Sequence, residues 1–422
     1  MDAAAHLTQL QDRFNAHLLP TYRTPPLAFV RGRGSALFDA EDRAYLDFVS
    51  GLAVTSLGHA HPAVTAAVAE QVATLVHTSN LFLTEPAVAL AERLADLLGW
   101  PDGRAFLCNS GAEANEAAIK LARRHGLAQH RDKYRVVALE GSFHGRTLAT
   151  LEATGQLAKH DPFQPLAGYV DHVAHDDPDA LRAAVGEDTC AVLVEVIQGE
   201  GGVRAVPDAV LSTARDACDR HGALLIVDEI QTGIGRTGSW FAWQQTAIEP
   251  DVVTLAKALA NGLPIGACVA RGPAANAFAP SQHASTFGGN PVTCAAALAV
   301  VDTLEADDLV ASAATAGKRL ANALRGLVGA VPHAAGVRGR GLLLAVELDR
   351  PVAASVEAAC RDRFLLVNAV ADDLVRMAPP LTVTDDEIEL AIAALSDALA
   401  SVARAGQASS SAADADRAGS EE

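Results

Sequence analysis

Three short segments of the sequence carry groups suited to chemistry, and the first holds a lysine. Lys257 lies in the sequence TLAKAL, between leucine and alanine residues. Such apolar surroundings hydrate an ammonium poorly, and desolvation lowers the pKa of an amine and frees its lone pair to attack a carbonyl carbon. Lys257 is therefore a candidate for imine formation. The alternative is a surface lysine whose stem packs on apolar neighbours.

The second segment is a pair of acids, Asp228 and Glu229, which directly follow the apolar sequence ALLIV. Neighbouring residues at a strand end point to opposite faces, so one carboxylate can face a ligand while the other caps or pairs. A carboxylate at the end of a buried strand is costly to desolvate without a positive partner. The pair predicts contact with a cationic group, and the alternative is a solvated turn.

The third segment, Ser110-Gly111-Ala112, follows the apolar sequence RAFLC and opens a helix predicted to run to His125. Free N–H groups in the first turn of a helix bind anions, and small residues let an anion approach the backbone. The segment is a candidate phosphate site, with an ordinary N-cap serine as the alternative. The sequence contains no GxxxxGK[ST] motif, so a Walker-type nucleotide site is not predicted.

The elements that position these segments are strands that are apolar throughout rather than alternating. This pattern indicates burial on both faces, as in a parallel sheet covered by helices. The strands alternate with helices, which predicts an α/β fold with a mostly parallel central sheet over residues 62–304. The polar segments follow strand ends, where open α/β sheets bind ligands. The strands are predicted at 104–108, 135–140, 190–196, 223–227 and 252–255.

The pattern changes after residue 304. Helices predicted over 311–327, 352–363 and 385–402, with a strand over 341–348, indicate a smaller α+β domain at 305–404. Residues 1–61, which begin with an amphipathic helix, are expected to pack on this smaller domain. Residues 405–422 contain no large apolar residue, which predicts a disordered tail.

Composition argues against several classes of partner. The chain has 33 Lys+Arg against 51 Asp+Glu, and its formal net charge of −18 opposes binding to nucleic acid or to an anionic membrane surface. The longest apolar run, Cys294–Val301, is far too short for a membrane helix. The six cysteines form no CxxC pair and have no metal-ligand spacing. We expect reduced thiols, no metal site and a cytoplasmic location.

Together, an imine-forming lysine, a buried carboxylate and a phosphate cradle are what pyridoxal 5′-phosphate (PLP) requires. The competing interpretation is a nicotinamide dinucleotide fold, because Gly233–Gly238 reads GIGRTG and follows a strand. The third glycine of that motif serves close helix–strand packing. The bulky residues that follow here, Trp240, Phe241 and Trp243, argue against that interpretation.

The sequence resembles the class III (ornithine-type) aminotransferases of PLP fold type I. The resemblance implies that Lys257 forms the Schiff base with PLP and that Asp228 contacts the pyridine nitrogen. The matching stretches follow the family order from Asp47 to Leu381 and read DFVSGLAVTSLGHAHP, NSGAEANEAAIKLAR, SFHGRT, EVIQGEGG, LLIVDEIQTGIGRTG, TLAKALANGLPIGA, STFGGNP, GVRGRGLLLAVEL and VRMAPPL.

The same resemblance implies the remaining cofactor contacts. Phe143 is expected to stack on the ring, Gln231 to lie near the ring hydroxyl, and the segment at the start of the helix to hold the phosphate. Thr286 is expected to reach the phosphate from the other subunit, which implies a homodimer with shared active sites. The full set of implied cofactor contacts is Ser110, Gly111, Ala112, Phe143, Asp228, Glu229, Ile230, Gln231, Lys257 and Thr286.

Two arginines, Arg146 and Arg376, match the family's carboxylate-binding positions. A guanidinium suits this role because it forms two parallel charge-assisted hydrogen bonds with a carboxylate. Glu200 matches a glutamate that shields one arginine while the amino donor is bound, and Ser285 is expected to touch substrate. This arrangement would let one pocket accept both an amino donor and the dicarboxylate 2-oxoglutarate.

The forms GLAV, SNL and STFGGNP resemble the N-acetylornithine branch of the family, and Leu52 stands where the ornithine branch carries a tyrosine. The expected reaction is transamination of N2-acetyl-L-ornithine with 2-oxoglutarate, giving N-acetyl-L-glutamate 5-semialdehyde and L-glutamate in arginine biosynthesis. The alternative is another class III ω-aminotransferase acting on ornithine, succinylornithine, 4-aminobutyrate or a diamine.

Overall fold

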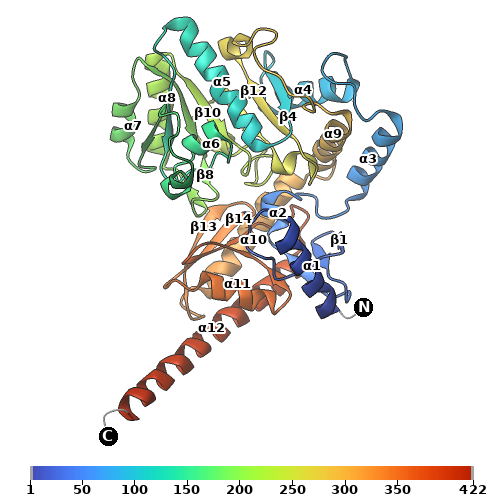
Figure 1. Ribbon diagram of the computed structural model, residues 1–422, viewed down its shortest axis with the longest axis vertical. Helices are drawn as coiled ribbons and strands as arrows, with labels where there is room; N and C mark the ends of the chain where they lie inside the picture. Colours follow the sequence, from blue (N-terminus) through green and yellow to red (C-terminus); the bar gives the residue numbers. More distant parts are fainter. Residues whose placement is uncertain (1–2, 420–422) are drawn as a thin grey trace.

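The computed structural model describes residues 3–419, with side chains described for residues 5–407. Its upper part in Figure 1 is built on a seven-stranded sheet in the order β4-β12-β11-β10-β7-β5-β6. The strands of this sheet are β4 (Arg104–Cys108), β5 (Arg135–Leu139), β6 (Val170–Val173), β7 (Thr189–Val194), β10 (Leu224–Asp228), β11 (Val252–Leu255) and β12 (Gly266–Ala270).

The sheet is mostly parallel, as the sequence predicted. The pairs β6-β5, β5-β7, β7-β10 and β10-β11 are parallel, and β12, which the sequence did not reveal, is antiparallel to both β11 and β4. Two successive reversals make β4 run in the same direction as β11. The ends of β4, β5, β7, β10 and β11 therefore lie along one edge of the sheet.

Helices cover both faces of this sheet, which explains why its central strands β7, β10 and β11 are buried along their whole length. Val252 and Cys268 pack with residues of α5 (Gly111–Gln129), whereas Val253 and Leu255 belong to the core formed with α4 (Glu85–Leu98) and α9 (Pro291–Ala306). Adjacent strand residues thus face opposite layers. The α/β class predicted from the sequence is confirmed.

The lower part of Figure 1 contains a second, four-stranded sheet with α10 and α11 packed against it. Its strand order is β13-β14-β17-β16, and all its pairs are antiparallel. These elements are α10 (Leu309–Leu327), β13 (Ala334–Arg340), β14 (Leu343–Leu348), α11 (Ala353–Arg361), β16 (Asn368–Ala371) and β17 (Leu374–Met377).

The N-terminal residues join this lower part through a small sheet. Strands β1 (Arg31–Arg33), β2 (Ala36–Phe38) and β3 (Ala44–Asp47) pair in order, and β3 pairs in parallel with β15 (Leu365–Leu366). The first and last hundred residues therefore share one sheet. Domain limits at residues 61 and 304 remain predictions, and the second falls within helix α9.

The remaining helices and strands are short or lie at the periphery. They are α1 (Ala3–His17), α2 (Ser50–Ala53), α3 (Pro62–Thr74), α6 (Leu148–Ala153), α7 (Pro178–Ala184), β8 (Ile197–Gln198), β9 (Arg204–Ala205) and α8 (Asp208–His221). Among residues 3–419, no helix is both long and apolar enough to span a membrane.

The C-terminal segment differs from the prediction. Helix α12 (Asp385–Gly419) continues through most of the segment predicted to be a disordered tail, and residues 420–422 lie outside the described residues. The prediction rested on the lack of large apolar side chains, which reports on burial. Helix propensity is a separate property, and this segment is rich in alanine and has no proline.

Candidate active site

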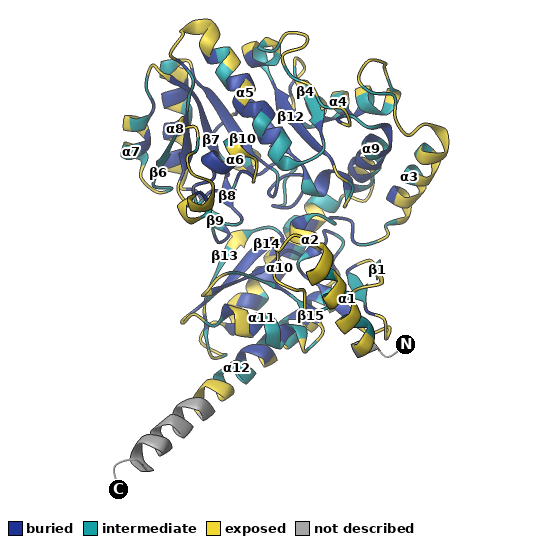
Figure 2. Ribbon diagram, viewed as in Figure 1, coloured by how far each residue is buried: buried dark blue, intermediate teal, exposed yellow. Residues whose placement is uncertain are grey.

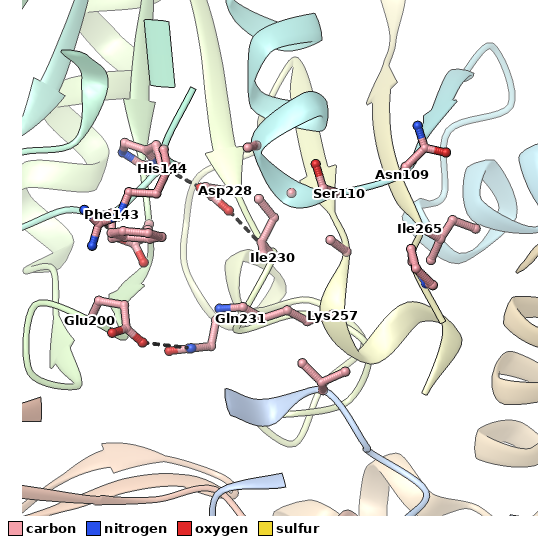
Figure 3. A pocket seen from close by; sticks show the side chains of 18 of the residues that line it. Asn109, Ser110, Phe143, His144, Glu200, Asp228, Ile230, Gln231, Lys257 and Ile265 are labelled. Atoms are coloured by element: carbon pink, nitrogen blue, oxygen red, sulfur yellow. Dashed lines mark hydrogen bonds and ion pairs between the residues drawn. The ribbon is translucent and has the colours of Figure 1, made fainter. Parts of the chain in front are cut away.

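A cavity of about 410 Å³ opens at the edge of the large sheet where the strands end. Figure 3 shows Phe143, His144 and Glu200 on one side of it, Ser110 and Asn109 on the other, and Asp228 and Lys257 between them. Ten of the predicted site residues line the cavity: Ser110, Gly111, Ala112, Phe143, Arg146, Glu200, Asp228, Ile230, Gln231 and Lys257.

Lys257 follows β11 after one residue, Ala256, and begins a short 3₁₀ helix (Lys257–Ala260). Its φ of +44° is left-handed, a conformation that non-glycine residues seldom adopt and that is often found at functional sites. Burial lowers the pKa of the Lys257 amine, and the charge of Arg376 adds to this while Glu200 opposes it. In the described part of the chain, no hydrogen bond or ion pair involves this amine. The amine is thus available as a nucleophile.

Asp228 is the last residue of β10 and is 3% exposed. Its Oδ2 accepts a hydrogen bond from Asn115 Nδ2 at 2.7 Å and lies 2.8 Å from His144 Nδ1. Its Oδ1 accepts the Ile230 N–H at 3.0 Å. Asn115 is oriented in turn by the Thr254 hydroxyl, which donates to Asn115 Oδ1 at 2.7 Å. The network holds a carboxylate at the cavity wall, ready for a cationic partner.

Two further cavity residues, His144 and Glu195, were missed by the sequence reasoning. Both lie within the motifs SFHGRT and EVIQGEGG, where neighbouring residues were assigned instead. Glu195 Oε2 accepts the Phe143 N–H at 2.9 Å and so anchors the segment that carries the aromatic ring. Burial raises the pKa of Glu195 to about 7, with His144 opposing and Asp228 reinforcing the shift.

The N-terminus of α5 opens onto the cavity. The Ser110 hydroxyl accepts the Glu113 N–H at 3.2 Å, so this serine is the N-cap that the sequence allowed as an alternative. Glu113 Oε2 accepts the Asn109 N–H at 2.8 Å. A Cβ atom on Gly111 would lie 2.7 Å from Ile230 Cδ1, so glycine allows the backbone to approach the cavity wall. An anion placed here would meet free N–H groups and the positive end of the helix dipole.

Arg376 and Glu200 form an ion pair beside the cavity. Arg376 lies on β17, is 2% exposed, and donates from Nη1 to Glu200 Oε1 at 2.6 Å and from Nη2 to Asn368 Oδ1 at 2.8 Å. Burial alone would raise the pKa of Glu200, but the charge and hydrogen bond of Arg376 hold it below its ordinary value. Glu200 lines the cavity, whereas Arg376 does not and contacts the cavity lining through Glu200.

The structure does not bring Glu229 to the cavity. Its carboxylate accepts the Trp243 N–H at 2.9 Å and the Thr232 hydroxyl, away from the cavity lining. Burial raises the pKa of Glu229 to about 7. The alternation of side chains along a strand separates the two neighbouring acids, so only Asp228 faces a ligand.

Ser285 and Thr286 also lie outside the lining of this chain's cavity. Ser285 Oγ accepts a hydrogen bond from Asn109 Nδ2 at 3.1 Å, so the loop that carries both residues is attached to the cavity wall. Thr286 is exposed. Leu52 does not line the cavity either, but Val54, two residues further on, does.

Residues Gly233–Gly238, which match a dinucleotide motif, form successive turns that lead to a short 3₁₀ helix (Ala242–Gln245). They therefore do not open the long helix that a dinucleotide site needs to hold pyrophosphate. Among residues 5–407, no group of three or more His, Cys, Asp or Glu side chains is placed to bind a metal ion.

Comparisons with known proteins agree with this geometry. The family model described as aminotransferase class-III matches residues 19–399. An acetylornithine aminotransferase of Mycolicibacterium smegmatis is 52% identical over 386 residues, which cover 92% of this chain and 97% of that protein.

Two solved structures extend the comparison. The N-acetylornithine aminotransferase of Stenotrophomonas maltophilia superposes with a TM-score of 0.81 at 35% identity, covering 93% of this chain and 99% of that one. A PLP-bound amine transaminase from an uncultivated Pseudomonas species superposes with a TM-score of 0.85 at 29% identity, covering 91% and 96%.

Proposed function

The chain belongs to the class-III aminotransferases, and from that membership we propose that it transfers the amino group of N2-acetyl-L-ornithine to 2-oxoglutarate. The products are N-acetyl-L-glutamate 5-semialdehyde and L-glutamate, in arginine biosynthesis. The relative with 52% identity supports this choice of substrate. The observation that carries the proposal is an amine available for imine formation beside the Arg376–Glu200 pair, with Arg146 in the same cavity.

The residues of the cavity fit PLP as the cofactor. The Lys257 amine would hold it covalently, the Asp228 carboxylate would keep its ring nitrogen protonated, and the backbone of Gly111 and Ala112 would bind its phosphate. Among residues 5–407, Asp228 Oδ1 accepts one N–H group, so it can take a further hydrogen bond. When bound, PLP draws electrons from the substrate carbon that loses its proton. The PLP-bound transaminase supports this assignment.

Lys257 Nζ then serves as the proton carrier of the reaction. As a free amine, it would take the proton from the substrate carbon that bears nitrogen and later release it as a general acid. Burial lowers the pKa of this amine, so more of it is in the neutral, basic form near neutral pH. Phe143, whose backbone Glu195 anchors, would keep the ring in position.

Glu200 adapts the pocket to its two substrates. While it is paired with Arg376, as in this structure, it neutralises the arginine and suits a donor whose reacting end carries no carboxylate. Displacement of Glu200 would free the Arg376 guanidinium for the carboxylate beside the keto group of 2-oxoglutarate. Arg146 would bind the carboxylate at the far end of either substrate.

We also propose a homodimer in which Thr286 reaches the phosphate in the partner's cavity. Thr286 is exposed and does not line the cavity of its own chain, which supports this arrangement.

The six cysteines are unpaired and buried, as expected in a reducing compartment, and we assign the enzyme to the cytoplasm.

Steady-state kinetics across amino donors tests the proposal. We expect N-acetylornithine to give a higher kcat/KM than ornithine, succinylornithine, 4-aminobutyrate or a diamine, each with 2-oxoglutarate as acceptor. A higher value for any other donor would reassign the substrate within the family. Lys257→Ala should abolish turnover and the visible absorbance of bound PLP, whereas Lys318→Ala, an exposed lysine on α10, should change neither.

A further inference from the structure

One residue of β11 differs in chemistry from the rest of its strand. Strand β11 reads VVTL and is buried along its whole length, so Thr254 places a hydroxyl group inside an apolar layer. Val252, two residues earlier, packs with residues of α5, and the alternation of side chains points Thr254 toward the same helix. A hydroxyl buried there is costly unless it forms a hydrogen bond. The partner of Thr254 therefore indicates why a polar residue stands at this position.

That partner is Asn115, a fully buried residue in the second turn of α5. The Thr254 hydroxyl donates to Asn115 Oδ1 at 2.7 Å. Asn115 Nδ2 donates to the His144 carbonyl at 2.8 Å and to Asp228 Oδ2 at 2.7 Å. A flipped amide would turn Oδ1 toward these two acceptors, so the observed orientation is the one that satisfies all three neighbours.

The order of the strands brings these groups together. Strands β10 and β11 pair in parallel with Asp228 opposite Thr254, and Ile226, two residues before Asp228, packs with residues of α5. Both side chains therefore point toward the helix, where Asn115 connects them. Neither Thr254 nor Asn115 lines the cavity, so they can act on a bound ligand only through their neighbours.

These contacts leave the two oxygens of Asp228 with different capacities (Figure 3). Oδ2 accepts from Asn115 and also lies 2.8 Å from His144 Nδ1. Among residues 5–407, Oδ1 accepts the Ile230 N–H and no other group. Since each carboxylate oxygen has two lone pairs, Oδ1 is the oxygen that can accept a hydrogen bond from a ligand.

We propose that Thr254 and Asn115 are positioning residues, which fix the rotation of the Asp228 carboxylate so that Oδ1 meets the ring nitrogen of the cofactor. The inference rests on the proposed function, because that nitrogen belongs to PLP. Each hydrogen bond in a chain polarises the next, so the Thr254 hydroxyl also strengthens the bond from Asn115 to the carboxylate. A carboxylate oriented in advance binds the ring N–H without a further loss of freedom.

Cofactor binding tests the proposal with two rings. PLP and its analogue with carbon in place of the ring nitrogen are titrated into the cofactor-free enzyme and followed by fluorescence. Thr254→Val keeps the side-chain shape and removes the hydroxyl. We expect it to weaken PLP binding about tenfold and to leave binding of the analogue unchanged, because the analogue offers Asp228 no N–H group.

Two further variants serve as controls. Thr254→Ser keeps the hydroxyl and should bind PLP as tightly as the wild type. Thr189→Val removes another buried hydroxyl, at the start of β7, which accepts the Gly186 N–H at 3.0 Å. It should change the affinity for neither ring. Asn115→Ala should weaken PLP binding more than binding of the analogue, and it gives the same comparison if Thr254→Val does not fold.

A double-mutant cycle separates positioning from general damage to the fold. Adding Thr254→Val to Asn115→Ala should cause no further loss of PLP affinity, since the hydroxyl acts through the amide. Equal losses for the two rings, additive losses in the double variant, or unchanged PLP affinity in Thr254→Val would overturn the proposal. If the variants behave as expected but N-acetylornithine is not a substrate, the positioning role stands and the substrate assignment fails. A wild type that binds both rings equally would refute the positioning role together with the contact of Asp228.

Discussion

At the scale of single residues, the site depends on charged groups whose neighbours set their protonation. Lys257 is made less basic by burial, and Asp228 is held by Asn115 and His144 in a buried network. Glu229, one residue further on, has no role at the cavity and carries its carboxyl into the protein interior. Its position therefore affects stability rather than ligand binding.

The stability of the enzyme should depend on pH through Glu229. Burial raises the pKa of its carboxyl to about 7, against about 4.5 in the unfolded chain. The folded state therefore binds more protons between these values, and this group's contribution to stability falls as the pH rises through that window. Glu229→Gln removes the ionisation. The free energy of unfolding in urea of Glu229→Gln, minus that of the wild type, should be about 2 kcal/mol greater at pH 8 than at pH 5.5.

Glu389→Gln provides the matched control, because Glu389 is exposed on α12. It should follow the wild-type pH profile. If the pH profile of Glu229→Gln runs parallel to that of the wild type, the Glu229 carboxyl ionises normally in the folded protein and the argument from burial is wrong.

At the scale of elements, the site is made by strand ends and one helix N-terminus. Three strands, β10, β11 and β4, are followed by Glu229, Ala256 and Asn109, which lead into the groups that line the cavity. Helix α5 begins where it does because the Ser110 and Glu113 side chains cap its first turn. The remaining N–H groups of that turn are left for a ligand.

A methyl group on Gly111 should damage this cradle. Gly111→Ala places a Cβ atom 2.7 Å from Ile230 Cδ1 and displaces that side chain from its place in the cavity wall. We expect PLP affinity to fall about tenfold, measured by fluorescence titration of the cofactor-free enzyme. Gly326→Ala, at an open position of α10, should leave PLP affinity unchanged and raise stability by about 0.5–1 kcal/mol. Equal PLP affinities in the two variants would contradict the close approach.

At the scale of the whole molecule, one exposed apolar region stands beside the site. The loop after α3 is tied to the loop of Thr286: Asn80 Nδ2 donates to the Ser285 and Gly288 carbonyls, at 3.1 and 2.9 Å. Figure 2 shows α3 as mostly exposed. Large apolar patches on a protein surface commonly mark interfaces. The exposed apolar side chains of these two loops are Leu75, Val76, Leu81, Phe82, Leu83 and Phe287.

Mixed dimers test whether Thr286 serves the partner's cavity. Subunits carrying Lys257→Ala are combined with subunits carrying Thr286→Glu, which would repel a phosphate. In the mixed dimer, the subunit that retains Lys257 receives an intact Thr286 from its partner, so one working site forms. We expect both parent proteins to be impaired and the mixture to regain activity, up to half of wild type per mixed dimer.

Light scattering must first show that each parent protein is dimeric. A mixture no more active than its parents would mean that Thr286 acts within its own subunit or not at the site. A monomeric wild type would refute the shared site altogether.

Local patterns in the sequence were enough to predict several strands of the large sheet and the reactive residues that follow them. Largely apolar runs identified β4 and β11 with their observed bounds. Every residue of β11 is buried, which accounts for its apolar run, whereas β4 is mostly half-buried. The positions of Lys257, Asp228 and Gly111 at the ends of such runs also predicted that they would meet at one edge. These inferences hold because they depend on residues adjacent along the chain.

Only the tertiary structure decided which groups meet across long separations. The pairing of Arg376 with Glu200, the contact of His144 with Asp228, and the second antiparallel pairing that aligns β4 all join distant segments. The orientation of Glu229 away from the cavity depends on where β10 ends within the sheet. Such contacts are set by strand order and layer packing, which no local run of residues encodes.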